Sequence, residues 1–141
     1  MSLKNIYTED VQYVSPETKL SEVAKLMETH DCGSILVAQN DKLTGVITDR
    51  DIVIRCVSQS KDPSSMMADD CKTSEVLYCF ADDDPEEVLD NMAQNKVKRL
   101  PVLNNDQDKR LVGIVSFGDL SAACDHKEVS GKAMDEIRRA A

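Results

Sequence analysis

The hydrophobic positions of the chain have a helical period in two separate stretches, one in each half. In both stretches the apolar residues are spaced as on the core-facing side of a helix. The members of this stripe are Leu20, Val23, Ala24 and Met27 in the first stretch, and Val88, Leu89 and Met92 in the second. A helix start precedes the second stretch, with Asp84 as the predicted N-cap and Pro85 in the first helical position. The pattern predicts two similar helices that end near residues 30 and 95.

Apolar runs short enough for buried strands follow each predicted helix in pairs. They cover residues 34–38 and 43–48 in the first half, and residues 99–103 and 111–116 in the second. The polar residues between the two runs of a pair predict a hairpin. Short extended pieces are predicted before the helices, at residues 11–14 and 76–80. A second helix is predicted after each hairpin, with Ile52, Val53 and Val57 on its apolar side in the first half and residues 120–124 in the second.

The two halves are copies of one pattern. A shift of 65 residues aligns Met27 with Met92, and after an insertion of three residues a shift of 68 aligns Asp51 with Asp119. Each copy is predicted as β-α-β-β-α, which is too small to bury a sound core alone, so we expect the two copies to share one. The predicted fold class is α/β (α+β), with two repeats related by a pseudo-twofold axis. The expected boundaries are residues 4–58 for the first repeat, 59–75 for a linker, 76–124 for the second repeat and 125–141 for a polar C-terminal helix or tail.

Composition and charge narrow the class of partner. The chain has 141 residues and a formal net charge of -9, which disfavours binding to the phosphate backbone of nucleic acids. No apolar run approaches the roughly 18–20 residues that span a bilayer. The first residues have no signal-peptide pattern, so we expect a cytoplasmic protein with no membrane partner.

The five cysteines show no spacing typical of a zinc site or a Cys-x-x-Cys redox motif. We expect them to be reduced thiols packed as small hydrophobic residues, with no metal bound. A redox-sensing pair remains the alternative. Catalysis finds little support, because neither His30 nor His126 belongs to a recognisable nucleophile–base arrangement and a Walker-type glycine-rich loop is absent.

A short motif closes each copy, where the last predicted strand meets the following helix. It is Gly45-Val46-Ile47-Thr48-Asp49-Arg50-Asp51-Ile52 in the first copy and Gly113-Ile114-Val115-Ser116-Phe117-Gly118-Asp119-Leu120 in the second. A hydroxyl and a carboxylate on one side of a helix start offer acceptors for a ribose diol, beside N–H groups that favour an anion. The alternative is that the hydroxyls only cap the helices and the carboxylates only complement the helix dipole.

The doubled pattern with Gly-x-x-Thr/Ser-x-x-Asp at the end of each copy resembles a tandem pair of CBS domains, the Bateman module. The resemblance covers residues 4–124, and the segment Val97-Lys98-Arg99-Leu100-Pro101-Val102 is also similar to the usual start of a strand in this family. It implies a regulatory module without catalytic activity that binds AMP, ADP, ATP, NAD or S-adenosylmethionine in clefts between the repeats. It also implies a flat homodimer.

The resemblance further implies that each cleft combines the closing motif of one repeat with the strand start of the other. The first cleft would be formed by Thr48, Arg50, Asp51, Tyr78, Cys79, Phe80, Lys98, Arg99, Leu100 and Pro101. The second would be formed by Ser116, Asp119, Val14, Ser15, Gly33, Ser34 and Ile35. Because the cations lie in the first set, we expect a phosphorylated ligand there.

The resulting prediction is a sensor of adenine nucleotides or a related metabolite that requires no cofactor and regulates an enzyme or a transporter. Two other functions stay open at this point. One is a protein-interaction adaptor that binds no ligand, and the other is a thiol-based redox sensor.

Overall fold

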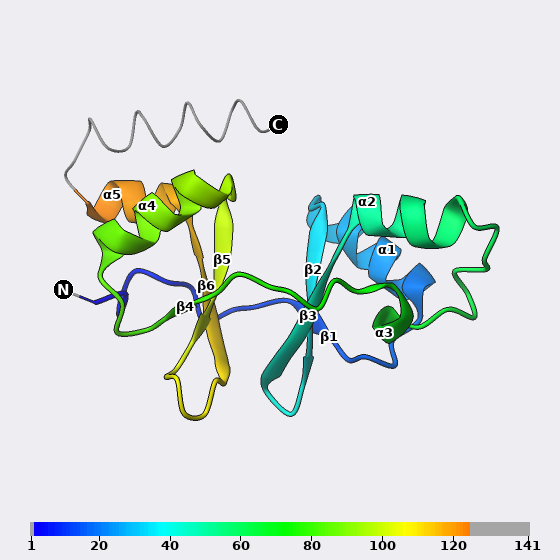
Figure 1. The fold of residues 1–141 in the computed structure, drawn as a ribbon, viewed down its shortest axis with the longest axis horizontal. Coiled ribbons are helices and arrows are strands. Elements are labelled where there is room, and N and C mark those ends of the chain that lie inside the picture. The colour runs from blue at the N-terminus through cyan, green and yellow to red at the C-terminus, as the bar shows by residue number, and fades with distance from the viewer. Residues whose placement is uncertain (1, 125–141) are drawn as a thin grey trace. The chain divides into compact units, whose positions relative to one another are not determined.

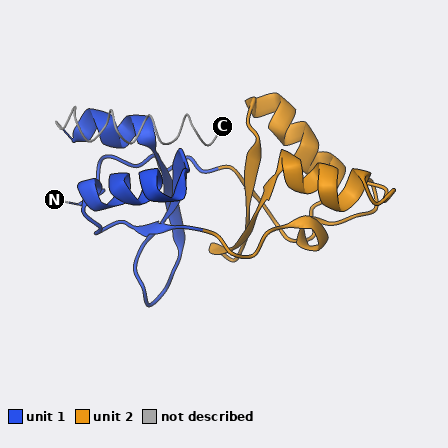
Figure 2. Cartoon of the chain, turned by 45° about the horizontal axis from the view of Figure 1, so that its top comes forward, with its two compact units in different colours: residues 1–11, 77–141 blue, residues 12–76 orange. Residues whose placement is uncertain are grey.

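A computed structural model describes residues 2–124, and the predicted polar segment at residues 125–141 lies outside them. The elements follow the predicted order in both halves of the chain (Figure 1). Contacts divide the chain into two compact units (Figure 2). We call residues 12–76, orange in the figure, the first-repeat unit. The second-repeat unit, blue in the figure, consists of residues up to Val11 together with those from Leu77 onward.

The first-repeat unit contains a three-stranded sheet with the order β1-β2-β3. Strand β1 runs parallel to β2, and β2 runs antiparallel to β3. The elements are β1 (Tyr13–Val14), α1 (Leu20–His30), β2 (Ser34–Gln39), β3 (Lys42–Thr48), α2 (Asp49–Ile52), the π-helix η1 (Val53–Val57) and α3 (Ala68–Cys71).

The second-repeat unit has the same topology, with the strand order β4-β5-β6 and the same parallel and antiparallel pairs. Its elements are β4 (Cys79–Phe80), α4 (Pro85–Asn95), β5 (Arg99–Leu103), β6 (Leu111–Ser116) and α5 (Phe117–Ala123). Helices α4 and α5 lie side by side on one side of this sheet (Figure 1). The predicted α/β class and the doubled β-α-β-β-α pattern are confirmed.

The long helices end as their sequences suggest, but one begins differently. Asp31 and Lys96, directly after α1 and α4, have left-handed backbone angles (φ 49° and 58°) that stop the helix. Asp84 occupies the predicted N-cap position of α4, yet its side chain makes no capping bond. The neighbouring Asp83 instead accepts the N–H of Phe80 at 2.9 Å, and this bond fixes the turn before the helix.

In the second helix of the first repeat, the buried side differs from the predicted apolar side. After Ile52 the helix widens into η1, where the N–H of Ser58 donates to the carbonyl of Val53, five residues earlier. The wider turn points Cys56 into the core and leaves Val53 and Val57 53% and 62% exposed. The apolar side formed by these two valines therefore faces away from the core of this unit.

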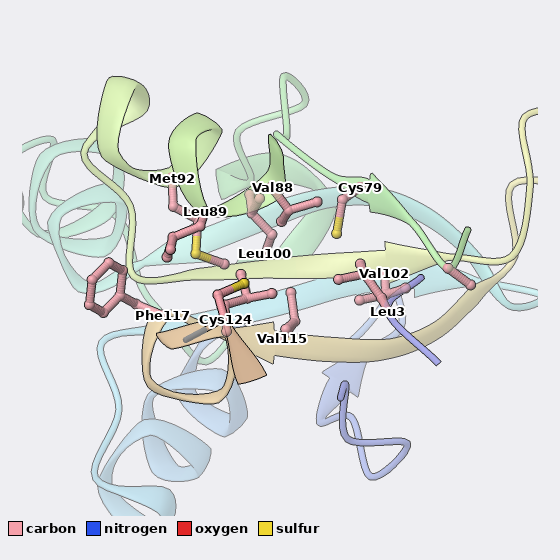
Figure 3. Close-up of a cluster of buried hydrophobic side chains, with 12 residues drawn as sticks. Leu3, Cys79, Val88, Leu89, Met92, Leu100, Val102, Val115, Phe117 and Cys124 are labelled. Carbon is pink, nitrogen blue, oxygen red and sulfur yellow. The ribbon is translucent and has the colours of Figure 1, made fainter. Parts of the chain in front are cut away.

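Each unit has a buried hydrophobic core of its own. The cluster of the first-repeat unit includes Leu20, Val23, Met27, Val37 and Ile47. That of the second-repeat unit includes Leu89, Met92, Leu100, Val102 and Val115 (Figure 3).

Each core is completed by residues that precede the other repeat in the sequence. Leu3 is fully buried among the side chains of the second-repeat cluster (Figure 3), and its N–H donates to the carbonyl of Ala81 at 3.0 Å. Thr8 pairs with Ile114 of β6 through two backbone hydrogen bonds of 2.9 Å. We call residues 2–11 the leading segment of the second-repeat unit, although they stand before the first repeat in the chain.

The connector between the repeats has the equivalent place in the first-repeat unit. Thr73 pairs with Val46 of β3 through backbone hydrogen bonds of 2.8 and 3.0 Å. Ala68 and Cys71 of α3 are fully buried in that unit's core. The segment expected to be a linker at residues 59–75 is thus packed with the repeat that precedes it.

Candidate functional site

The closing motif of the first repeat forms a capping box where β3 meets α2, which we call the first corner. The N–H of Asp51 donates to Thr48 Oγ1 at 3.1 Å, and the N–H of Thr48 donates to Asp51 Oδ2 at 2.9 Å. The capping role considered for these side chains is therefore present. A carboxylate has about four lone-pair sites, so this role leaves acceptors for a further donor.

The second corner, where β6 meets α5, repeats this arrangement. The N–H of Asp119 donates to Ser116 Oγ at 3.0 Å, and the N–H of Ser116 donates to Asp119 Oδ2 at 3.1 Å. Both corners are partly buried. The sequence repeat is thus also a repeat of hydrogen bonds.

The helix start at the first corner has no N–H group left for an anion. Asp49 donates its N–H to Gly33 O at 2.9 Å, and Arg50 donates its N–H to Asp49 Oδ1 at 2.9 Å. The N–H groups of Thr48 and Asp51 belong to the capping box. The expectation that this helix end attracts a phosphate does not hold, because its donors are satisfied locally. A phosphate there requires side-chain cations.

Asp51 has further partners from the connector and from η1. The hydroxyl of Thr73 lies 3.3 Å from both carboxylate oxygens of Asp51. The guanidinium of Arg55 lies 3.6 Å from Asp51 Oδ1. The same Arg55 nitrogen donates to the carbonyl oxygens of Cys71 at 2.8 Å and Lys72 at 2.9 Å, and to the Thr73 hydroxyl at 3.1 Å.

Asp119 lacks these partners among residues 2–124. The position equivalent to Arg55 holds Ala123, which has no charge to offer. The position equivalent to Thr73 holds Thr8, which pairs with β6 through its backbone alone. The two corners therefore share their capping geometry and differ in how far the carboxylate is already engaged.

Within each unit, the predicted strand-start residues lie beside that unit's own corner. Arg99 is the cross-strand partner of Ser116, and Lys98 accepts the N–H of Phe117 at 2.8 Å through its carbonyl oxygen. Ser34 is likewise the cross-strand partner of Thr48. The two halves of each predicted cleft lie in different units, so their combination stays a prediction.

Several predicted ligand-contacting residues have side chains that belong to the cores. Val14 and Ile35 are 6% and 3% exposed in the first-repeat core, and Cys79 and Leu100 are each 4% exposed in the second-repeat core. Ligand contacts from these four positions would have to come from the main chain. The cations Arg50, Lys98 and Arg99 are exposed and form no ion pair within residues 2–124, so they are available to an anion.

Two of the predicted residues form an aromatic pair. The rings of Tyr78 and Phe80 meet edge to face, with centroids 5.5 Å apart, and Lys109 Nζ lies 5.9 Å from the Tyr78 centroid. Tyr78 is 39% exposed.

Two further predicted residues, Pro101 and Ser15, form no part of this pair. Pro101 of β5 is buried. Ser15 has its hydroxyl 3.1 Å from that of Thr18, so it is locally engaged.

Three of the buried cysteines are poor nucleophiles. Burial, reinforced by the negative charge of Asp83, raises the pKa of Cys79 to about 12. Burial also raises the pKa of Cys71, with Asp51 adding to the effect, and that of Cys124, with Glu86 adding to the effect. Since the thiolate is the reactive form, these three thiols are disfavoured as redox sensors.

Sequence reasoning missed Arg55 and Thr73 as neighbours of the site. A signal for each was present, because Arg55 stands four residues after Asp51, the spacing of a helical ion pair, and Thr73 follows Thr8 by the repeat shift of 65. Within the described part of the chain, no group of three or more His, Cys, Asp or Glu side chains could hold a metal ion. None of the described helices has the length and hydropathy needed to cross a bilayer.

Comparisons with known proteins agree with the duplicated architecture. The sequence profile of the CBS domain matches the chain twice, at residues 3–58 and 68–126. The CBS domain-containing protein YhcV of Bacillus subtilis is 34% identical over 136 residues, which cover 96% of this chain and 94% of YhcV.

Two solved structures show the same fold. The crystal structure of Hypoxic Response Protein I with two coordinated zinc ions has a TM-score of 0.75 at 30% identity, and the match covers 88% of this chain and 99% of that one. The CBS domain pair of protein MJ0100, in complex with 5-methylthioadenosine and S-adenosyl-L-methionine, has a TM-score of 0.68 at 24% identity over 87% of this chain and 98% of that one.

Proposed function

Because this chain belongs to the CBS-domain family, as a tandem pair of repeats, we propose that it is a regulatory module that binds an adenosine-type ligand and catalyses no reaction. The observation that carries the proposal is the corner present in both units, in which a hydroxyl and an aspartate share a helix start. Candidate ligands are AMP, ADP, ATP, NAD and S-adenosylmethionine, and no further cofactor is required. The adenosyl ligands of the MJ0100 domain pair support this class.

In this proposal the ribose and the phosphates contact different residues. The carboxylates of Asp51 and Asp119 accept the two hydroxyls of a ribose, a device common in nucleotide sites. Phosphates contact Arg50, Lys98 and Arg99, because the helix start at the first corner has no free N–H group. Each cleft combines a corner of one repeat with the strand start of the other, as in the sequence-based prediction.

We also propose a homodimer that responds to its ligand and acts on an enzyme or transporter. Val53, Ile54 and Val57 are 46–62% exposed on η1, and burial of such side chains favours association. The five free cysteines, four of them buried, fit the reducing environment of the cytosol.

Calorimetric titration of the chain with the five candidate ligands tests the ligand class. It is repeated on Asp51→Asn and Asp119→Asn, which keep an oxygen for the capping bond and lose the carboxylate charge. Loss of a charged hydrogen bond to ribose should weaken binding in the affected cleft by about tenfold or more. Asp49→Asn, which removes a neighbouring carboxylate outside the capping box, is the matched control.

Two results would contradict the proposal in different ways. Equal binding by the wild type and both aspartate variants would remove the ribose role from the corners. No heat and no change of melting temperature with any of the five ligands would favour the adaptor function, for which the exposed apolar residues of η1 are the candidate contact.

A further inference from the structure

The carboxylate of Asp51 is tied to the connector between the repeats. The Thr73 hydroxyl contacts both of its oxygens at 3.3 Å, and Arg55 places a positive charge 3.6 Å from Oδ1. The Asp51 side chain is 14% exposed and that of Arg55 is 41% exposed, so water partly screens the ion pair between them. The side of the carboxylate that faces Thr73 is therefore already engaged within the chain.

Arg55 links this carboxylate to the main chain of the connector. One of its terminal nitrogens donates to the carbonyls of Cys71 and Lys72 and to the Thr73 hydroxyl. Thr73 itself is held against β3 by its backbone pair with Val46. We call the contacts that Arg55 and Thr73 make with Asp51 and with residues 71–73 the latch.

The second corner has no latch among the described residues. Ala123 replaces Arg55 at the equivalent position, and the Thr8 hydroxyl makes no hydrogen bond to Asp119. The capping bonds of the two corners agree to within about 0.2 Å. The bond to the carboxylate is 2.9 Å at the first corner and 3.1 Å at the second, and the bond to the hydroxyl is 3.1 Å and 3.0 Å. The latch is thus a difference added to an otherwise repeated structure.

We propose that the latch competes with the ligand for Asp51, so that binding at the first corner releases residues 71–73 from the carboxylate. This inference rests on the proposed function, because it requires a ribose at the corner. The ribose hydroxyls take over the acceptor positions that face Thr73, and the Thr73 hydroxyl loses its two contacts with the carboxylate. Occupancy of the first corner then loosens the connector, whereas occupancy of the second corner has no such effect.

The alternative is that Arg55 and Thr73 hold Asp51 in the orientation that the ligand needs. The two roles predict opposite signs. A competing latch weakens binding, so its removal strengthens the complex, whereas removal of an orienting group weakens it. Damage to the fold also weakens binding, so a gain in affinity is diagnostic.

The test uses Thr73→Ala and Arg55→Ala in the full chain carrying Asp119→Asn, which reduces binding at the second corner. Adenosine is the probe, because it has the ribose diol and no phosphate, so removal of the Arg55 charge changes no phosphate contact. We expect each variant to bind adenosine about threefold or more tightly than the Asp119→Asn chain, as expected for release from one weak competing hydrogen bond. The gain should be smaller for 2′-deoxyadenosine, which has only one of the two ribose hydroxyls.

Thr8→Ala is the matched control, because it removes the equivalent threonine, whose hydroxyl contacts no corner. It should leave adenosine affinity unchanged. Unchanged or weaker binding by Thr73→Ala would overturn the latch. Since Thr73→Ala keeps the Arg55 bonds to the connector backbone, its result stands even where Arg55→Ala lowers the folded population.

Hydrogen exchange of the Asp119→Asn chain gives a second readout. Saturating adenosine should speed the exchange of the Thr73 and Val46 amides, which bond to each other's carbonyls in the absence of ligand. Slower or unchanged exchange with adenosine bound would overturn the latch and leave the proposed function in place. Absence of binding by any of the five candidate ligands and by adenosine would instead overturn the proposed function, and the latch with it.

Discussion

Gly45 and Gly113 occupy equivalent positions in the two closing motifs, and at both positions a neighbouring backbone lies too close for a side chain. A Cβ at Gly45 would lie 2.9 Å from the carbonyl oxygen of Thr73. A Cβ at Gly113 would lie 2.7 Å from that of Thr8 and would also overlap the Tyr7 ring. Glycine is therefore required because a segment preceding one repeat crosses the last strand of the other.

Gly113→Ala is expected to destabilise the chain. The added methyl group must push back a paired backbone and an aromatic ring, at a cost of about 1–3 kcal/mol in the free energy of unfolding. Urea denaturation measures this cost. The matched control is Gly118→Ala in α5, where the nearest atom to a new Cβ is 3.7 Å away. There the loss of backbone freedom in the unfolded chain should stabilise the fold by about 0.5–1 kcal/mol. A common midpoint for both variants would contradict the close-approach explanation.

These glycines also show how far sequence reasoning reaches. The doubled spacing predicted both corners and their capping alternative, because hydrogen bonds between residues 48 and 51 are local. The packing of the leading segment and of the connector could not be predicted in the same way. Their contact with Gly45 and Gly113 joins backbone atoms far apart in the chain, and backbone atoms leave little trace in side-chain pattern. The engagement of Asp51 by the Thr73 hydroxyl is a side-chain contact, and it was missed although Thr73 follows Thr8 by the repeat shift of 65.

Among the elements, α2–η1 and α5 show how one repeated pattern can support two different surfaces. Helix α5 buries Phe117 and Leu120. The π-helical turn of η1 buries Cys56 and turns three aliphatic side chains outward. A helical apolar pattern could not predict this, since it assumes the period of an α-helix throughout.

The hairpins differ as well. Asn40 and Asp41 form a tight turn with positive φ, while Asn104 organises a longer loop by accepting the N–H groups of Asn105 and Arg110.

The end of α4 offers a stability test at the scale of an element. Lys96 has a φ of 58°, a left-handed conformation that is less favourable for a residue with a Cβ than for glycine. Lys96→Gly should therefore raise the free energy of unfolding by about 0.5–1 kcal/mol. Gln94→Gly is the control, because Gln94 is exposed within α4 and the same new residue should there lower stability by a similar amount. Urea denaturation of the two variants should give shifts of opposite sign, and shifts of the same sign would contradict the assignment of the helix end.

At the scale of the whole molecule, neither repeat completes its own fold. The core of the second-repeat unit contains Leu3, and that of the first-repeat unit contains Ala68 and Cys71 from the connector. The chain therefore passes from the second-repeat unit into the first and back again. A substitution near the N-terminus should accordingly destabilise the structure beyond residue 76 and have less effect on the repeat that follows it directly.

Leu3→Ala tests this prediction. Leu3 is fully buried, so its truncation should cost about 2–5 kcal/mol, an effect typical of a large side chain removed from a core. Hydrogen exchange should show the loss of protection in α4 and β5, with α1 and β2 changing less. Leu77→Ala is the control, because Leu77 is 47% exposed and should tolerate the change. Greater loss of protection in α1 than in α4 would contradict the assignment of residues 2–11 to the second-repeat unit.

The exchanged leading segments also bear on the ancestry of a duplicated chain. In this chain the last strand of each repeat pairs with the segment that precedes the other repeat. A polypeptide with a single copy would have no second repeat to supply that segment. Two such polypeptides could satisfy each other by reciprocal exchange, as in a domain-swapped dimer. Fusion of two copies end to end would then preserve every one of these contacts while removing the need for a second molecule. On this view the connector at residues 59–75 is the descendant of an N-terminus, which explains why Thr73 and Thr8 still occupy matching places on their sheets.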